Sequence, residues 1–288
     1  MAFGAGWDAA VLAGVLGLLV GSFLNVVIYR FPKMLERQWA AECAEYTGQP
    51  VPEHEPFNLV VPRSRCRQCG HLIRWYENIP VVSWLVLRGR CSECKTSIGL
   101  RYPVVELVTA CFFGLCGWRW GLTPQAAAWA AFAALLICLF LIDMDTQILP
   151  DDLNYTLLWL GLLAAALGWT VPLKSAVWGA AVGYLLFWSI FQLFKLATGK
   201  EGMGYGDFKL LAALGAWFGV EYLLAIVLLS SIVGAVIGIL LLLVGKIANK
   251  EIPMPFGPYL AGAGLLCLVL SPAAVPELIP FAFPFGAR

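Results

Sequence analysis

Asp143 and Asp207 are the residues of this 288-residue chain best suited to catalysis at a membrane boundary. Asp143 directly follows the apolar run 126–142, at the carboxyl end of a predicted helix, where the helix dipole disfavours an anion. Asp207 ends a glycine-rich run and precedes the apolar segment 208–219. If the two carboxyl groups meet, one proton is shared, so the charged member can activate a water molecule while the neutral member donates to a carbonyl. The pair therefore predicts peptide-bond hydrolysis without a covalent intermediate.

The acidic residues also allow simpler interpretations. Asp207 could be only the N-cap of a short helix over 208–219. Asp151 and Asp152 follow Pro150 at the start of the next helix, where an acid suits the helix dipole, and we interpret them as helix-end residues. A different class of enzyme also remains open, a transferase in which the acidic loop 143–152 holds Mg²⁺ against a phospholipid or polyprenyl phosphate.

Four cysteines form two Cys-x-x-Cys motifs separated by 21 residues, a spacing typical of zinc sites. They are Cys66, Cys69, Cys91 and Cys94. Four thiolates leave no open coordination position, so the predicted zinc is structural and not catalytic. A pair of disulfides is the alternative, which a reducing cytoplasm disfavours. His71 adjoins the first motif and is expected to lie beside the metal site or at the surface without binding the metal. Cys43 is expected in a loop.

The elements that must position these groups are membrane helices. Of all residues 60% are hydrophobic and 13% charged, with a mean hydropathy of +0.80, which excludes an ordinary water-soluble globule. The 12 Trp, 17 Phe and net charge of +1 disfavour disorder and give no support for nucleic acid as a partner. The expected surroundings are a lipid bilayer.

A transmembrane helix needs about 20 mostly apolar residues. The sequence contains eight hydrophobic segments, at 9–29, 102–118, 126–142, 153–171, 175–194, 208–219, 222–244 and 256–271. It therefore predicts an all-α polytopic membrane protein with about eight transmembrane helices. The segment 208–219 is too short to span, so it is either a half-helix or continues through Gly219 into its neighbour.

The basic residues predict the orientation. With Met1 outside and eight crossings, 16 of the 19 Lys and Arg residues fall in inside loops, as the positive-inside rule requires. Both termini are then periplasmic. The first run carries Asp8 and no preceding basic residue, so we expect a retained span and not a cleaved signal peptide.

The composition divides the chain into three parts. Residues 1–30 form the first transmembrane helix, 31–101 a cytoplasmic zinc-binding domain, and 102–288 the transmembrane peptidase domain. A domain of about 70 residues is too small to be stable by core burial alone, and zinc would supply the missing stabilisation.

Motifs along nearly the whole chain resemble those of the type IV prepilin peptidases, the prepilin leader peptidase/N-methyltransferases. They are Gly21-Ser22-Phe23-Leu24-Asn25-Val26-Val27, the two cysteine motifs with Tyr76-Glu77-Asn78-Ile79-Pro80 between them, Arg101-Tyr102-Pro103, Leu141-Ile142-Asp143, Leu149-Pro150-Asp151, the Gly-x-Gly-Asp motif at 204–207, and Pro255-Phe256-Gly257-Pro258-Tyr259.

The resemblance implies that Asp143 and Asp207 are an aspartyl dyad at the cytoplasmic face of the bacterial inner membrane. It implies cleavage of type IV prepilins and type II secretion pseudopilins after a glycine that ends a short basic leader. It further implies N-methylation of the new N-terminal residue, usually phenylalanine, with S-adenosylmethionine as methyl donor. Residues that bind the donor, the pilins that are processed and the oligomeric state stay open.

Overall fold

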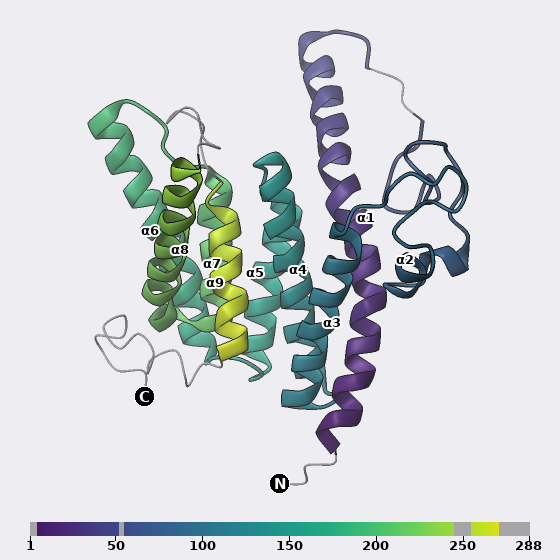
Figure 1. Ribbon diagram of the computed structural model, residues 1–288. Helices are drawn as coiled ribbons and strands as arrows, with labels where there is room; N and C mark the ends of the chain where they lie inside the picture. The colour runs from purple at the N-terminus through teal and green to yellow at the C-terminus, as the bar shows by residue number, and fades with distance from the viewer. Residues whose placement is uncertain (1–4, 52–54, 245–254, 271–288) are drawn as a thin grey trace. The chain divides into compact units, whose positions relative to one another are not determined.

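The computed structural model describes residues 5–51, 55–244 and 255–270, and these residues are mostly helical (Figure 1). The chain divides into two compact units, Met1–Ala134 and Leu135–Arg288. Because the boundary falls within α4 (Pro124–Thr146), the carboxyl half of that helix, which contains Asp143, belongs to the second unit.

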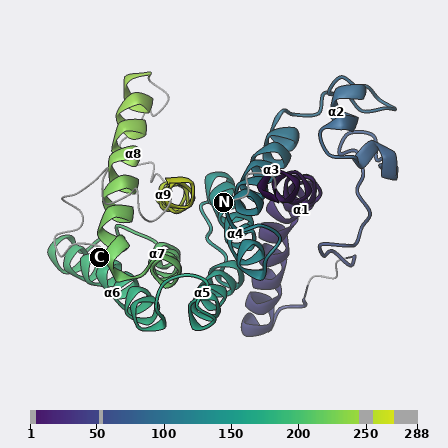
Figure 2. The ribbon, with the colours of Figure 1, turned by 90° about the horizontal axis from the view of Figure 1, so that it is seen from below.

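The first unit is built on two long helices that lie side by side, α1 (Ala5–Thr47) and α3 (Arg101–Trp120) (Figures 1 and 2). Glycines on α1 allow the close approach: a Cβ added to Gly21 would lie 2.7 Å from the Cα atom of Glu106. The Asn25 side chain bonds across the pair, donating to the Tyr102 carbonyl at 3.2 Å.

The helix α1 extends well beyond the predicted span 9–29, crossing Arg30 without a break. The prediction followed hydropathy, which falls where charged residues begin. Apart from Pro32, which α1 accommodates, the residues that follow favour a helix, among them three Glu and three Ala. The expectation of a loop around Cys43 was therefore wrong, since Cys43 lies within α1.

Between α1 and α3 the chain forms a small cysteine-containing domain with little regular structure. It contains η1 (Trp75–Asn78), α2 (Val82–Val86) and two isolated antiparallel β-bridges. The Arg30 guanidinium ties its proline-rich part to α1, donating to the carbonyls of Asn58 and Pro62 at 2.9 and 2.7 Å.

The second unit surrounds the short helix α7 (Tyr205–Phe218), which is buried along nearly its whole length. Its described helices besides α7 and the end of α4 are α5 (Asp151–Ala166), α6 (Leu173–Thr198), η2 (Val220–Tyr222), α8 (Leu223–Leu243) and α9 (Gly257–Leu270). All of α5, α6, α8 and α9 contact α7, and Figure 2 shows it among them. The helix is thus a fixed central element.

By length and composition, four helices of the described chain are long and apolar enough to cross a membrane: Gly6–Thr47, Pro124–Thr146, Leu173–Thr198 and Val220–Leu243. The predicted helical architecture is confirmed, with these four helices as candidate spans, whereas the number of eight spans stays a prediction. The segment 208–219 is a separate helix, because Gly219 ends α7 at a φ of +83°. The predicted periplasmic location of the termini concerns residues 1–4 and 271–288, which lie outside the described residues.

Candidate active site and metal centre

Asp143 lies in the last turn of α4, as predicted, and is only 4% exposed. Another helix partly offsets the dipole of α4 at this carboxyl group. The Gly257 backbone N–H at the start of α9 is directed at the Asp143 carboxyl group. Because the amino end of a helix carries a partial positive charge, α9 offsets the unfavourable dipole of α4.

Asp207 is the third residue of α7 and is 7% exposed. The helix begins at Tyr205 and its N-cap is Gly204, which makes no side-chain cap. The interpretation of Asp207 as an N-cap is therefore wrong. The glycine-rich run provides the extended backbone that precedes the helix, and this leaves the Asp207 carboxyl group inside the first turn without a capping role.

The two buried carboxyl groups lie close enough to interact electrostatically. The charge of Asp143 acts on Asp207 across the gap between them. Within the described part of the chain, Oδ2 of Asp143 and Oδ1 of Asp207 are buried and make no hydrogen bond. Buried polar atoms are normally hydrogen-bonded, so two unpaired carboxylate oxygens are what a site for a further polar group would present.

The α4–α5 connection closes one side of this pair through Leu149. A Cβ added to Gly206 would lie 2.7 Å from Leu149 Cβ, and one added to Gly257 would lie 2.9 Å from Leu149 Cδ1. A side chain at either position would therefore displace Leu149, and at Gly257 it would displace the Asp143 carboxyl group as well. Reasoning from residue chemistry missed Gly257 and Leu149, and the signal that could have revealed Gly257 is its place in the Pro-Phe-Gly-Pro motif.

The other acids of the 143–152 loop have different roles. Asp151 and Asp152 begin α5 as predicted, and Asp151 pairs with Lys209 of α7 at 2.6 Å. The one group of His, Cys, Asp and Glu residues in the described chain that could hold a metal ion is the cysteine cluster. The acids of this loop thus do not converge in the way that the Mg²⁺ alternative needs.

The cysteine cluster has the geometry of a zinc centre. The Sγ atoms of Cys66, Cys69, Cys91 and Cys94 lie within 4.8 Å of one another, and the four residues are free thiols. The Cys66 and Cys94 sulfurs are 3.8 Å apart. Zn–S bonds of about 2.3 Å in a tetrahedron place sulfurs about 3.8 Å apart, so the residues present fit this ion.

The two cysteine motifs form the same local structure. The Cys66 N–H donates to the His71 carbonyl at 2.8 Å, and the Cys91 N–H donates to the Thr96 carbonyl at 2.9 Å. Bonds from Thr96 lower the pKa of Cys94 to about 6, whereas the pKa of Cys69 is raised to about 11, so the four neighbouring thiols do not all ionise without a cation. Two turns of equal geometry thus present four sulfurs to one point.

His71 does not belong to the cysteine cluster, in agreement with the expectation. Its Nε2 lies 3.1 Å from Oε2 of Glu77 and 3.3 Å from the Ser92 hydroxyl. Hydrogen bonds from the Arg74 backbone N–H and from Ser92 lower the pKa of Glu77 to about 2. The contacts among His71, Glu77 and Ser92 therefore link η1 to both cysteine motifs.

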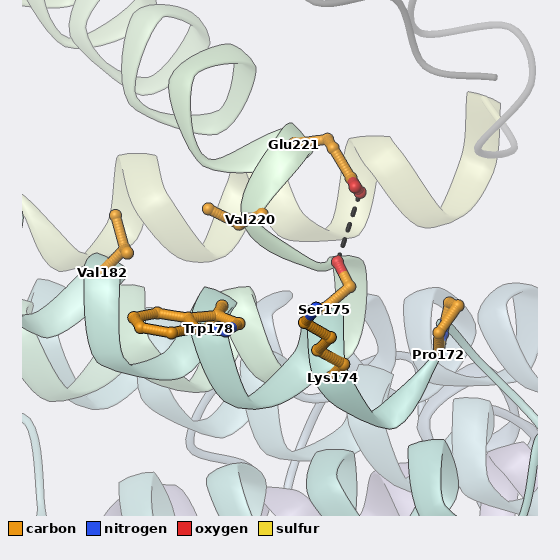
Figure 3. Close-up of a pocket in the computed structure, with 7 residues that line it drawn as sticks. All are labelled: Pro172, Lys174, Ser175, Trp178, Val182, Val220 and Glu221. Carbon is orange, nitrogen blue, oxygen red and sulfur yellow. Dashed lines mark hydrogen bonds between the residues drawn. The ribbon is translucent and has the colours of Figure 1, made fainter.

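A surface groove of about 450 Å³ lies elsewhere in the second unit, at the start of α6 and at η2 (Figure 3). It is lined by Pro172, Lys174, Ser175, Trp178, Val182, Val220 and Glu221. The Ser175 hydroxyl donates to Glu221 at 3.3 Å across it. This groove adjoins the carboxyl end of α7, about 16 Å along the helix from Asp207, so it is not part of the acid pair's site.

Comparison with known proteins identifies the family. Residues 15–120 match the bacterial peptidase A24 N-terminal domain, and residues 130–239 match the type IV leader peptidase family. The chain belongs to this family and is a peptidase with N-methyltransferase activity.

Several relatives are similar over nearly their whole length. A prepilin leader peptidase/N-methyltransferase of Pseudomonas aeruginosa is 53% identical over 271 residues, covering 93% of this chain and 92% of the relative. The proteins of the same name from Pseudomonas putida and Aeromonas salmonicida are 55% and 50% identical, covering 90% and 93% of this chain and 89% and 93% of their own lengths. No solved structure matches the chain.

Proposed function

We propose that this chain cleaves the basic leader from type IV prepilins and type II secretion pseudopilins, with Asp143 and Asp207 as its catalytic pair. The observation that carries the proposal is the pair of buried, unpaired carboxylate oxygens contributed by α4 and α7. The family membership supports the substrate, because relatives of this length are named prepilin leader peptidases.

The reaction follows from a pair of acids that shares one proton. The ionised carboxylate accepts a proton from a water molecule, which attacks the scissile carbonyl, while the protonated acid donates to the carbonyl oxygen. The proximity of the two carboxyl groups keeps one of them neutral, since two adjacent anions in a poorly hydrated site repel strongly. Hydrolysis then needs no covalent intermediate.

The membrane placement is part of the same proposal. Eight spans, with the zinc domain between the first and second, put the catalytic pair and the zinc domain on the cytoplasmic side of the inner membrane and both termini in the periplasm. The basic residues favour this orientation, since 16 of 19 then lie in inside loops. The leader of the substrate would therefore be removed where it enters the membrane.

Substitution of the acids tests the catalytic assignment. We expect each single variant, Asp143→Asn or Asp207→Asn, to abolish prepilin cleavage while the protein stays folded. The introduced amide cannot exchange the proton that the reaction requires. Asp152→Asn is the matched control, since this exposed acid lies outside the pair, and it should retain activity. Full cleavage by either dyad variant contradicts the assignment. Cleavage should also continue after Mg²⁺ chelation, whereas a lipid-phosphate transfer activity that stops on chelation would favour the transferase alternative.

The second activity in the proposal is methylation of the new N-terminal amine by S-adenosylmethionine. The relatives' names support it. Mass spectrometry of a prepilin incubated with and without the methyl donor separates the activities, because leader loss and the gain of one methyl group are different mass changes. Cleavage without any methyl gain in the presence of the donor would contradict this part.

Zinc in this proposal is structural. The cysteines Cys66, Cys69, Cys91 and Cys94 would hold it, and its four bonds would join the two turns that otherwise share little core. We expect Cys66→Ser combined with Cys94→Ser to unfold the 31–101 domain and to impair methylation before cleavage. Metal analysis of the purified wild type should find about one zinc per chain, and a result of none would remove the basis for this role.

A further inference from the structure

The helix α2 is short, yet it has two distinct faces. Its inner face carries Trp84, whose indole N–H donates to the Ile98 carbonyl at 3.1 Å within the cysteine-containing domain. Its outer face carries Val82, Leu85 and Val86, at helical positions i, i+3 and i+4. Leu85 and Val86 are 61% and 75% exposed, so the outer face is an apolar surface that nothing in the described chain covers.

Trp75 lies on η1, seven residues before α2, and is 79% exposed. Its ring packs edge-to-face with Tyr76 at 5.7 Å between centroids. Amphipathic aromatic rings of this kind concentrate at the boundary between lipid and water. Trp75 and the outer face of α2 are together named the apolar ridge below.

A hydrogen bond to α3 sets the position of α2 along the expected membrane normal. The buried Glu106 carboxylate accepts a hydrogen bond from the Val81 N–H at 2.7 Å, and Val81 is the N-cap of α2. Glu106 lies five residues, or about 7.5 Å, into α3 from Arg101. The predicted span begins at residue 102, so this bond holds the start of α2 near the level at which α3 is expected to enter the bilayer.

Val81 also has a backbone conformation that few side chains tolerate. It has a φ of +59°, and the Val82 N–H bonds to the Pro80 carbonyl around it, which makes a strained three-residue turn. The bond to Glu106 holds this turn in place. The structure therefore fixes the position of α2 relative to α3 at an energetic cost, as expected if that position matters.

The surroundings of the ridge are cationic. Between Glu55 and Arg101 there are eight Lys and Arg residues against three Asp and Glu. A zinc ion with four thiolates adds two negative charges, and the domain remains positive. Arg74, Arg88 and Arg90 flank η1 and α2 and are exposed. Anionic phospholipid headgroups are the complementary partner, because an apolar face with basic neighbours is the pattern of interfacial helices.

We propose that the apolar ridge inserts into the membrane interface and that the flanking arginines bind anionic phospholipid headgroups. This contact holds the cysteine-containing domain against the bilayer surface. A second copy of the chain fits less well, since its own cationic residues would be repelled. The same repulsion disfavours the basic leader expected of a prepilin.

The test uses the full chain in nanodiscs of phosphatidylglycerol that carry brominated acyl chains. Subtracting the fluorescence of Trp75→Phe from that of the wild type gives the emission of Trp75. We expect the brominated lipids to quench this emission. Leu85→Glu combined with Val86→Glu should lower the quenching of Trp75 at least roughly twofold, because charged groups leave the interface. Val60→Glu is the matched control, an exposed apolar position of the same domain, and should leave it unchanged.

The lipid headgroup is tested by replacing phosphatidylglycerol with phosphatidylcholine, which should lower the quenching. An unchanged value overturns the anionic preference, and an unquenched Trp75 overturns the proposal altogether. Quenching that appears only when a prepilin is added would instead identify the ridge as a substrate-docking surface. Equal tryptic fragment patterns of the variants in detergent show that the domain is still folded.

Discussion

Gly257, in the first turn of α9, lies very close to the Asp143 carboxyl group. A methyl group added at Gly257 would displace that carboxyl group. The Cβ of an alanine would sit 2.5 Å from Asp143 Oδ2 and 2.9 Å from Leu149 Cδ1. Ordinary contacts begin near 3.4 Å, so the carboxyl group or α9 must move by about 1 Å. Asp143 would then no longer face Asp207 in the native arrangement.

The expected result of Gly257→Ala is a fall of roughly 100-fold in kcat for prepilin cleavage, or about 2.7 kcal/mol in the barrier, because a displacement of about 1 Å at a reacting group has this effect. KM should change little, because the substitution adds one buried methyl group and acts on the position of Asp143. Overpacking should also lower stability by about 1–3 kcal/mol.

The matched control is Gly262→Ala, five residues further along α9. Its nearest neighbour would be Phe140 Cε2 at 3.9 Å, an ordinary contact. Cleavage of a purified prepilin is measured over time for both variants at the same substrate concentrations, with a thermal melt of each. A wild-type kcat for Gly257→Ala refutes the reasoning, and so does an equal loss in Gly262→Ala.

Two further predictions concern the helices that hold α7. Gly179→Ala should lower the melting temperature, because its Cβ would collide with the Gly215 carbonyl oxygen and neither backbone can retreat; an unchanged melt would contradict this α6–α7 contact. Trp217→Phe should destabilise the protein by about 1–3 kcal/mol, since the buried Leu157 carbonyl loses the indole donor at 2.8 Å. Equal unfolding midpoints for wild type and Trp217→Phe would show that this bond contributes nothing.

The parts of the molecule that depend on local sequence could be predicted. Each Cys-x-x-Cys motif brings its two sulfurs together through one tight turn, so the cluster follows from the spacing. The location of Asp143 at a helix end also follows from the point where the apolar run stops. In both cases the relevant contacts lie within a few residues along the chain.

Other features depend on residues far apart in the sequence and could not be predicted. Gly257 lies 114 residues after Asp143, and no periodicity connects them. The choice of Gly204 as N-cap was missed because both Gly204 and Asp207 are acceptable N-cap residues, and burial of the Asp207 side chain decides between them. The length of α1 was missed because hydropathy indicates which residues can lie in the membrane, whereas the helix continues beyond them.

The proposed catalytic pair is held by backbone packing and not by a network of side chains. Within the described residues, Asp207 Oδ1 has no hydrogen-bond partner that could orient it, so its position depends on the rigidity of α7. That rigidity comes from glycine contacts on two sides, at Gly215 against α6 and at Gly206 against Leu149. A site built on packed helices can hold its geometry more closely than one on loops. Glycines that bear no functional group are therefore expected to affect cleavage as strongly as polar residues do.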